Sequence, residues 1–260
     1  MCLDQIQWQP WYKKIINSLG YDPSEDRRAA LILNQLLKGK KISLDNLKLR
    51  IKDQPTLIFG AGPSLEADIK RIAKTSLFDI CRMITADGAT TGLLKIARKT
   101  PDIIVTDLDG RFEDLRDAND KGAFMVVHAH GDNIKHLNMY VKDLKDILGT
   151  TQVEPIGELY NFGGFTDGDR AVILAEVLNG KPLALAGMDL GNVTGNFSKE
   201  HIFSPDVKKV KLRFCKDILE WQAINTATKI FNLTGSGENI KGIERITPEK
   251  FENIILNSSR

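Results

Sequence analysis

The chain of 260 residues has few cysteines, almost no net charge and no long apolar run. Its three cysteines, Cys2, Cys81 and Cys215, lie far apart without metal-ligand spacing, which argues against a disulfide framework and indicates a reducing compartment. Lys and Arg total 36 against 34 acidic residues, so no global field attracts nucleic acid or anionic lipid. No run approaches the roughly 20 apolar residues of a membrane span, and no N-terminal stretch has the apolar region of a signal peptide. We therefore expect a cytoplasmic protein that binds small molecules and has no nucleic-acid or membrane partner.

Hydrophobic residues make up 42% of the chain, and many of them fall in short, nearly continuous apolar runs. Such runs are typical of parallel strands that are covered on both faces. They lie at 56–59, 81–86, 102–106, 123–129 and 182–187, with a further strand expected near 151–155. Stretches with the length and spacing of crossover helices lie between them, at 65–74, 91–98, 133–148 and 168–178. The pattern predicts an α/β fold with an open, mostly parallel Rossmann-like sheet and helices on both faces.

The two ends of the chain differ from this alternating pattern. Residues 1–53 contain helix signals and no strand-like run, so we expect a helical N-terminal segment followed by an α/β catalytic domain at 54–260. Within that segment, Trp8 and Trp11 are expected to pack in a core, as large aromatic residues usually do. Cys81 is likewise expected to be a core thiol. The sequence pattern of residues 206–260 predicts a mainly helical C-terminal part.

Six apolar stretches each lead into a short cluster of Gly, Asp or His. In an open α/β sheet the strands direct their carboxyl ends at one crevice, so clusters that are scattered in sequence gather there in space. Carboxylates at such an edge indicate a metal, and glycines indicate a phosphate. The clusters lie at 59–64, 85–90, 105–110, 127–132, 161–169 and 186–191.

The first cluster places Gly60, Gly62 and Ser64 between a strand and a helix, where free backbone N–H groups and the helix dipole favour a phosphate. Leu65 stands where a dinucleotide fingerprint has its third glycine, and no Walker lysine follows. The alternative is a tight turn that needs glycine for its geometry, with Ser64 capping the helix.

Asp107 and Asp109 follow a strand and are separated by one residue. Alternate side chains of an extended backbone point the same way, so both carboxylates are expected to face one Mg²⁺ ion. Either one could instead cap a helix or bracket a turn. The metal hypothesis gains weight because Asp87, Asp132 and the pair Asp167 and Asp169 end neighbouring strands in the same way.

Two further groups of residues leave alternatives open. His128 and His130 could bind zinc, but no third ligand lies in a supporting motif and His201 is remote, so contact with ligand or phosphate, or a core position, is favoured. Lys208 and Lys211 belong to a basic run that either forms a solvated helix face or folds over the crevice to neutralise a polyphosphate.

Several of these segments together resemble the archaeal 6-hydroxymethyl-7,8-dihydropterin pyrophosphokinases, a family similar in fold to the catalytic domain of thiamin pyrophosphokinases. The similarity spans roughly residues 55–215. It is carried by Gly60-Ala-Gly-Pro-Ser-Leu, Ala86-Asp-Gly-Ala, Pro101-Asp-Ile-Ile-Val-Thr-Asp-Leu-Asp-Gly, His128-Ala-His-Gly-Asp-Asn and Asn161-Phe-Gly-Gly-Phe-Thr-Asp-Gly-Asp-Arg-Ala. The resemblance implies Mg²⁺-dependent transfer of the β,γ-diphosphate of ATP to the hydroxymethyl oxygen of a reduced pterin, with release of AMP, on the way to tetrahydromethanopterin or folate.

Combined with the resemblance, the residues predict specific roles. Metal binding and catalysis are assigned to Asp107, Asp109 and Asp132, with Asp132 as a further ligand or as the acceptor of the hydroxymethyl proton. Nucleotide contacts are assigned to Gly60, Gly62, Ser64, Asp87, Gly88, His130, Lys208 and Lys211, with the ribose or the metal shell left open for Asp87. Recognition of the edge of the pterin is assigned to Asn161, Asp167 or Asp169, with no choice made among them.

Three other functions remain as alternatives. Thiamin as the acceptor is disfavoured, because thiamin pyrophosphokinases have Gly-Asp-x-Asp-Ser where this chain has Thr106-Asp-Leu-Asp-Gly, and they add a C-terminal β-sandwich. A CMP-sugar transferase of the motility-associated type shares the Gly-Ala-Gly-Pro-Ser-Leu segment, although such chains are much longer. A nucleotide-binding module without catalysis is the third alternative. The assembly state is open, with a homodimer among the possibilities.

Overall fold

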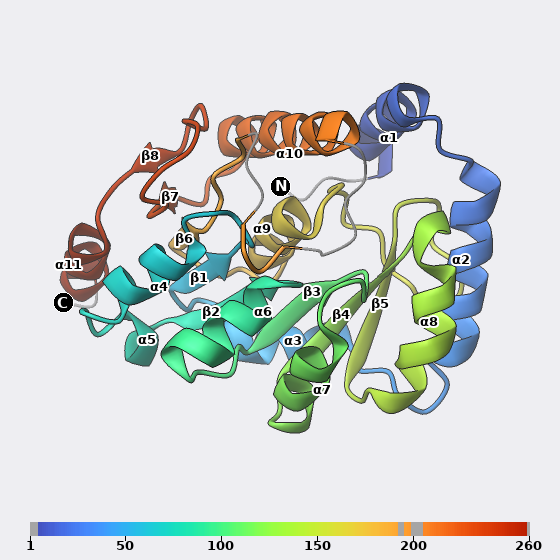
Figure 1. Cartoon of the computed structure of the whole chain (residues 1–260), viewed down its shortest axis with the longest axis horizontal. Helices are drawn as coiled ribbons and strands as arrows, with labels where there is room; N and C mark the ends of the chain where they lie inside the picture. Colours follow the sequence, from blue (N-terminus) through green and yellow to red (C-terminus); the bar gives the residue numbers. More distant parts are fainter. Residues whose placement is uncertain (1–4, 192–194, 199–204, 259–260) are drawn as a thin grey trace.

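The computed structural model describes residues 5–191, 195–198 and 205–258, so Cys2 and His201 lie outside the described residues. Its centre is one sheet of eight parallel strands in the order β5-β4-β3-β2-β1-β6-β7-β8 (Figure 1). The strands are β1 (Thr56–Phe59), β2 (Arg82–Ala86), β3 (Ile103–Thr106), β4 (Phe124–Ala129), β5 (Ile147–Thr151), β6 (Leu183–Ala186), β7 (Ile230–Asn232) and β8 (Glu244–Arg245). The predicted fold class is confirmed, and within the described residues the sheet is entirely parallel.

The sheet is covered by helices on both faces. The helices are α1 (Gln5–Leu19), α2 (Pro23–Leu36), α3 (Leu44–Ile51), α4 (Leu65–Ile72), α5 (Leu77–Ile80), α6 (Ala89–Gly92), α7 (Phe112–Asp120), α8 (Ile134–Tyr140), α9 (Asp167–Val177), α10 (Pro205–Asn225) and α11 (Pro248–Ser258). Short helical turns follow at Leu93–Ala97, Gly131–Asn133 and Val141–Asp143. Within these described ranges no helix is long and apolar enough to cross a membrane.

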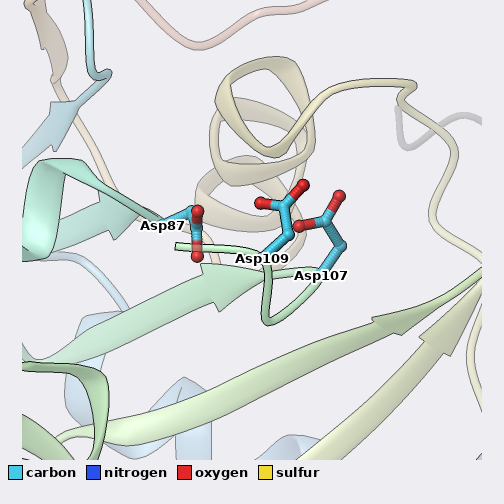
Figure 2. Close-up of side chains that lie close together, drawn as sticks. All are labelled: Asp87, Asp107 and Asp109. Carbon is cyan, nitrogen blue, oxygen red and sulfur yellow. The ribbon is translucent and has the colours of Figure 1, made fainter. Parts of the chain in front are cut away.

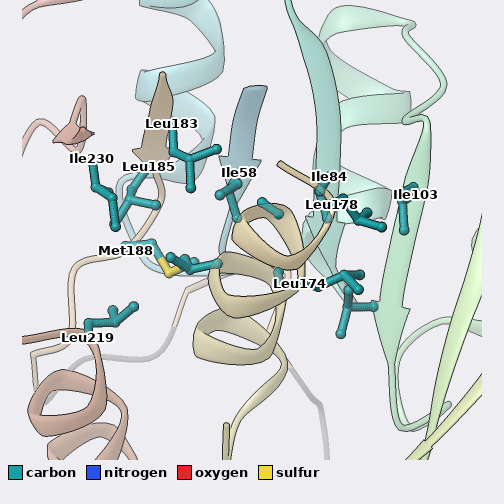
Figure 3. Packing of buried hydrophobic residues seen from close by; sticks show 14 of the residues in the cluster. Ile58, Ile84, Ile103, Leu174, Leu178, Leu183, Leu185, Met188, Leu219 and Ile230 are labelled. Atoms are coloured by element: carbon teal, nitrogen blue, oxygen red, sulfur yellow. The ribbon is translucent and has the colours of Figure 1, made fainter. Parts of the chain in front are cut away.

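Alternation along the strands decides which helices cover which face. In β1, Ile58 packs with α3, α9 and α10, and Figure 3 shows this cluster gathered around α9. Its neighbours Leu57 and Phe59 point to the opposite face and pack with α4, α5 and α11. Toward the β5 end of the sheet, Ile104 and Met125 pack with α2, α7 and α8. Because both faces are buried, every position of a central strand is apolar or hydrogen-bonded, and this explains the continuous apolar runs in the sequence.

The N-terminal segment is helical, as expected, and it contributes to these layers. Asp22 caps α2 by accepting a hydrogen bond from the Ser24 amide at 2.8 Å, and α2 packs over β4 and β5. In α1, Trp8 is fully buried beside α9 and α10 and donates to the Gln152 carbonyl at 2.8 Å, which confirms its packing role. Cys81 is also buried, and burial raises the pKa of its thiol to about 12. The boundary between this segment and a catalytic domain stays a prediction.

Two sequence-based expectations about the elements are wrong. The predicted helix at 133–148 ends at Tyr140, and the strand expected at 151–155 is β5, which begins at Ile147. The segment Ile147–Thr151, in which Ile147, Thr150 and Thr151 are β-branched, pairs with β4 and lies in the sheet. The C-terminal part is mainly helical, as expected, with α10 and α11, and it also adds β7, which pairs with β6, and β8, which pairs with β7. Both strands are too short for an apolar run to reveal them.

The connectivity places a crevice beside β1. The chain runs outward from β1 to β5 and then returns through α9 to β6, which pairs with β1 on its other side. Loops that leave β1 and β6 therefore diverge, and such a reversal in strand order is where ligands bind in open α/β sheets.

Candidate active site

A cavity of about 220 Å³ lies at the carboxyl edge of the sheet, at this reversal in strand order. The loops after β1, β2, β3, β4 and β6 contribute to it, together with the start of α9 and one side of α10. In Figure 1, α10 extends across this edge above α9. The residues that line it include Gly60, Gly62, Asp87, Gly88, Asp107, His130, Gln152, Asp167, Arg170, Asp189, Lys208 and Lys211. Clusters that the sequence analysis expected at one crevice therefore do meet there.

Three carboxylates gather on one side of this crevice. Asp87 follows β2, while Asp107 and Asp109 follow β3, and one oxygen of each lies within 4.8 Å of the others. Figure 2 shows the carboxylates of Asp107 and Asp109 beside each other, with Asp87 facing them from the next strand. Asp87 and Asp107 are only 5% and 6% exposed. We call these three residues the acid triad.

The backbone around the acid triad is unusual. Leu108 has a φ of +65° and Asp87 a φ of +41°, both in the left-handed region that non-glycine residues seldom adopt. The two acids after β3 therefore share a side because of a turn at Leu108, and the extended backbone assumed from the sequence is wrong. Gly110 lets this turn approach β2, because a Cβ there would lie 2.5 Å from the Asp87 carboxylate. Such strain concentrates at functional sites, since the surrounding structure must maintain it.

The acid triad fits a hard divalent cation. Buried carboxylates at this spacing repel one another, and a cation that takes several carboxylate oxygens offsets that repulsion. Asp132, expected to be a further ligand, lies outside both the acid triad and the cavity lining, and its side chain is 45% exposed. Asp87 instead lies beside Asp107 and Asp109, and the sequence analysis had left the ribose and the metal shell open for it.

The two histidines after β4 occupy different environments. His130 lines the cavity, and its Nδ1 lies 3.3 Å from the Asp132 amide, so the neutral ring carries its proton on Nε2 and donates to Asp107 Oδ2 at 3.2 Å. His128 is completely buried, with Nδ1 3.0 Å from Thr150 Oγ1. Burial, followed by the positive charge of Arg170, lowers the pKa of His128 well below its usual value. Neither histidine belongs to the acid triad, so within the described residues the zinc alternative gains no support.

A buried carboxylate holds the His130 loop in place. Asp26 of α2 accepts hydrogen bonds from the Tyr12 hydroxyl at 2.7 Å, the Gln152 amide at 2.8 Å and the Gly131 backbone N–H at 2.8 Å. These bonds connect α1, α2 and the end of β5 to the loop that carries His130. The N-terminal segment therefore supports the cavity directly.

In the loop after β1, backbone N–H groups that the sequence analysis expected to be free are hydrogen-bonded within the protein. The N–H groups of Gly60 and Gly62 donate to the carbonyls of Ala186 and Gly187, and that of Ser64 donates to Asp189 Oδ2 at 3.1 Å. The expectation that these N–H groups are free for a phosphate is wrong. Gly60 and Gly62 nevertheless line the cavity, so their contact with a nucleotide stays a prediction.

Ser64 does not cap α4 through its side chain. Its hydroxyl lies 2.7 Å from Asp68 Oδ2 and 2.9 Å from Asp189 Oδ2, while Ser236 donates to Asp189 Oδ1 at 2.7 Å. This network ties the loops after β1, β6 and β7 together, so Ser64 reaches the cavity only through Asp189.

The basic run on α10 divides into two groups. Lys208 and Lys211 line the cavity, as the folded-over alternative requires, and Lys211 Nζ lies 5.6 Å from the ring of Tyr21 and 5.9 Å from that of Phe165. Lys209 and Arg213 are exposed, as on a solvated face.

Of the three residues expected at the pterin, the structure places one in the cavity. Asp167 lines it at the start of α9. Asp169 caps α9, accepting from the Phe165 amide at 2.6 Å and from Thr166, and burial raises the pKa of its carboxyl. Asn161 stabilises its own loop through Val153 and Gly163. Asp169 and Asn161 are thus outside the cavity lining.

The residues that line the cavity and that sequence reasoning missed include Tyr21, Gln152, Arg170 and Asp189. Asp189 lies within a cluster that the sequence analysis had marked and Arg170 directly follows one, but no pattern singled out the individual side chains. Tyr21 and Gln152 carry no local signal, since they reach the cavity only through the packing of α1, α2 and β5.

Residues 31–195 match a family described as 6-hydroxymethylpterin diphosphokinase MptE-like. The chain belongs to this family. Proteins named 6-hydroxymethyl-7,8-dihydropterin pyrophosphokinase are similar to it over most of their length. The protein from Pyrococcus furiosus is 42% identical over 88% of this chain and 98% of its own length, and that from Methanothermobacter thermautotrophicus is 42% identical over 86% and 97%. The protein from Methanocaldococcus jannaschii is 38% identical over 84% and 95%.

A solved structure shares the fold of this MptE-like chain. The MAf glycosyltransferase from Magnetospirillum magneticum AMB-1 superposes with a TM-score of 0.57, over 93% of this chain and 42% of that protein. The sequences are 18% identical, so the likeness concerns the fold alone.

Proposed function

We propose that this chain transfers a diphosphate group from ATP to the hydroxymethyl oxygen of 6-hydroxymethyl-7,8-dihydropterin and releases AMP. The relatives that carry the name of this activity match nearly their whole length. The observation that carries the proposal is the acid triad of an MptE-like chain, in which the buried Asp87 and Asp107 line the cavity and the half-buried Asp109 lies beside them.

In this proposal the acid triad, Asp87, Asp107 and Asp109, holds Mg²⁺. When bound, Mg²⁺ neutralises the polyphosphate and orients it for attack. His130 donates to Asp107 and so fixes the direction of that carboxylate. Lys208 and Lys211 approach the phosphates from α10, together with Gly60, Gly62 and Gly88 from the strand ends.

The reaction needs positioning and charge neutralisation more than covalent help. The hydroxymethyl oxygen bonds to the β-phosphorus while the bond from that phosphorus to the oxygen of the α-phosphate breaks. AMP leaves with the bridging oxygen, and the hydroxyl proton is released. Cations on α10 and carboxylates at the strand ends lie on the lining of one cavity, which suits a polyanion bridged to a metal.

An assay of AMP formation tests this function. The protein is mixed with ATP, Mg²⁺ and the reduced pterin, and we expect AMP and no ADP. Asp107→Ala should lose about a hundredfold or more in rate, as when an electrostatic contact to a transferred phosphoryl group is removed. Formation of AMP with thiamin, release of CMP from a CMP-sugar, or ATP binding without turnover would each support an alternative function.

The substrates are small molecules in this proposal. A cytoplasmic location and a homodimeric assembly remain predictions from the sequence.

A further inference from the structure

Arg170 is a buried cation that the roles above do not use. It lies in the first turns of α9, lines the cavity and has a side chain only 8% exposed. Gly164 packs against its stem, since a Cβ there would lie 2.8 Å from Arg170 Cγ. The guanidinium is therefore held in place and does not lie free in solvent.

The hydrogen bonds of Arg170 are few and long. A guanidinium offers five N–H donors. Nη1 reaches Asp167 Oδ1 and Nη2 reaches Gln152 Oε1, both at 3.4 Å, which is beyond the usual range for N–H···O bonds. The buried Nε has no hydrogen-bond partner within the described residues. Unsatisfied buried donors are costly, and a guanidinium at a cavity whose bonds are this few and long retains the capacity to donate to a ligand.

The surroundings of Arg170 match a flat, partly apolar ring. Tyr21 and Phe165 line the same cavity with ring centroids 6.5 Å apart, and Phe165 lies two residues before the first residue of α9. Asp167, three residues before Arg170 on the same helix, also lines the cavity. A carboxylate acceptor thus lies beside a guanidinium donor next to aromatic walls.

We infer that Asp167 and Arg170 together recognise the 2-amino-4-oxopyrimidine edge of the pterin, with Arg170 donating to the 4-oxo oxygen. This inference rests on the proposed function for its ligand. The edge presents two neighbouring donors, the 2-amino group and N3–H, followed by an acceptor. A carboxylate next to a guanidinium presents the complementary order, so Arg170 is a specificity-determining residue.

Equilibrium binding tests the inference without turnover. The fluorescence of 6-hydroxymethylpterin and of its 2,4-diamino analogue, in which an amino group replaces the 4-oxo oxygen, is titrated with the protein. The wild-type chain should prefer the 4-oxo compound by about tenfold or more, because the analogue places a donor against the buried Arg170 and, since its N3 carries no proton, an acceptor against Asp167. Arg170→Met should lose the part of this preference that Arg170 supplies and leave the affinity for ATP unchanged. Arg116→Met is the matched control, since Arg116 is exposed on α7 and outside the cavity lining, and it should keep the preference.

Three results would overturn the inference. The first is a wild-type chain that does not prefer the 4-oxo compound, and the second is an Arg170→Met variant that retains the preference. The third is an Arg170→Met variant that loses affinity for ATP alone, which would make Arg170 a phosphate contact. If Arg170→Met does not fold, Arg170→Lys is titrated instead, and retention of the whole preference counts against the inference. A chain that shows the preference but forms no AMP contradicts the proposed function and leaves this inference standing.

Discussion

The acid triad predicts an unusual response of stability to a single substitution. Two unit charges 4.8 Å apart repel by about 3.5 kcal/mol at an effective dielectric constant of about 20. Asp107→Asn removes two of the three repulsive pairs, which together amount to about 7 kcal/mol at this distance. The charged hydrogen bond from His130 is weakened and costs about 1.5 to 3 kcal/mol. Without divalent cations, we expect the variant to be more stable than the wild type by about 2 kcal/mol or more.

The same substitution should weaken the response to Mg²⁺. A ligand at a hundredfold excess over its Kd stabilises the folded chain by about 2.7 kcal/mol. For a chain of this size that corresponds to a rise in Tm of roughly 5 to 10 °C. Thermal unfolding is measured in chelator and in Mg²⁺, with NaCl added to equal ionic strength so that screening does not differ. We expect the full rise for the wild type and a small fraction of it for Asp107→Asn.

Asp45→Asn is the matched control, because Asp45 is 85% exposed on α3 and only loosely paired with Lys48 at 3.8 Å. It should change neither the stability in chelator nor the Mg²⁺ response. The reasoning is refuted if Asp107→Asn is no more stable than the wild type in chelator and Mg²⁺ raises the Tm of both equally. That outcome would mean that the three carboxylates do not share a cation.

Three further predictions concern the residues that support the site. Because burial lowers the pKa of His128, the unfolded chain binds more protons below about pH 6.5, so stability should fall on acidification. Urea unfolding at pH 7.5 and 5.5 should show a smaller fall for His128→Gln, and an equal fall would contradict this explanation. Gly62→Ala places a methyl group against the Asp189 carboxylate and should cost about 1 to 3 kcal/mol of unfolding free energy. Gly191→Ala, whose Cβ would lie 4.0 Å from the nearest atom, is its control, and equal losses would argue against the clash. Asp26→Asn replaces one of the two acceptor oxygens by an NH₂ group that faces at least one of the three donors, and it should cost about 2 to 4 kcal/mol in urea unfolding. A loss within error of zero would show that this network does not hold the His130 loop.

Local pattern was sufficient to predict the layers of the fold. A buried parallel strand needs apolar residues on both faces, so β1, β2, β3, β4 and β6 stood out as continuous runs. The gathering of Asp and Gly clusters at one edge followed from the same logic, because parallel strands share a direction. Where a strand was short, as in β7 and β8, or carried polar residues, as in β5, the pattern was too weak to place it.

The roles of individual side chains depended on contacts between distant segments. Asp87 and Asp132 both follow strands, but only Asp87 meets Asp107 and Asp109, because a left-handed turn and the small Gly110 bring β2 and β3 loops together.

Sequence therefore determined which edge of the sheet carries the polar residues, since that depends on the direction and burial of each strand. Tertiary structure alone decided which backbone N–H groups were already bonded, as in the loop at Gly60, and which buried side chains lacked full bonding, as at Arg170. Both properties depend on partners far away in the chain. Hydrogen bonds and electrostatic forces act over a few ångströms, and sequence separation does not report that distance.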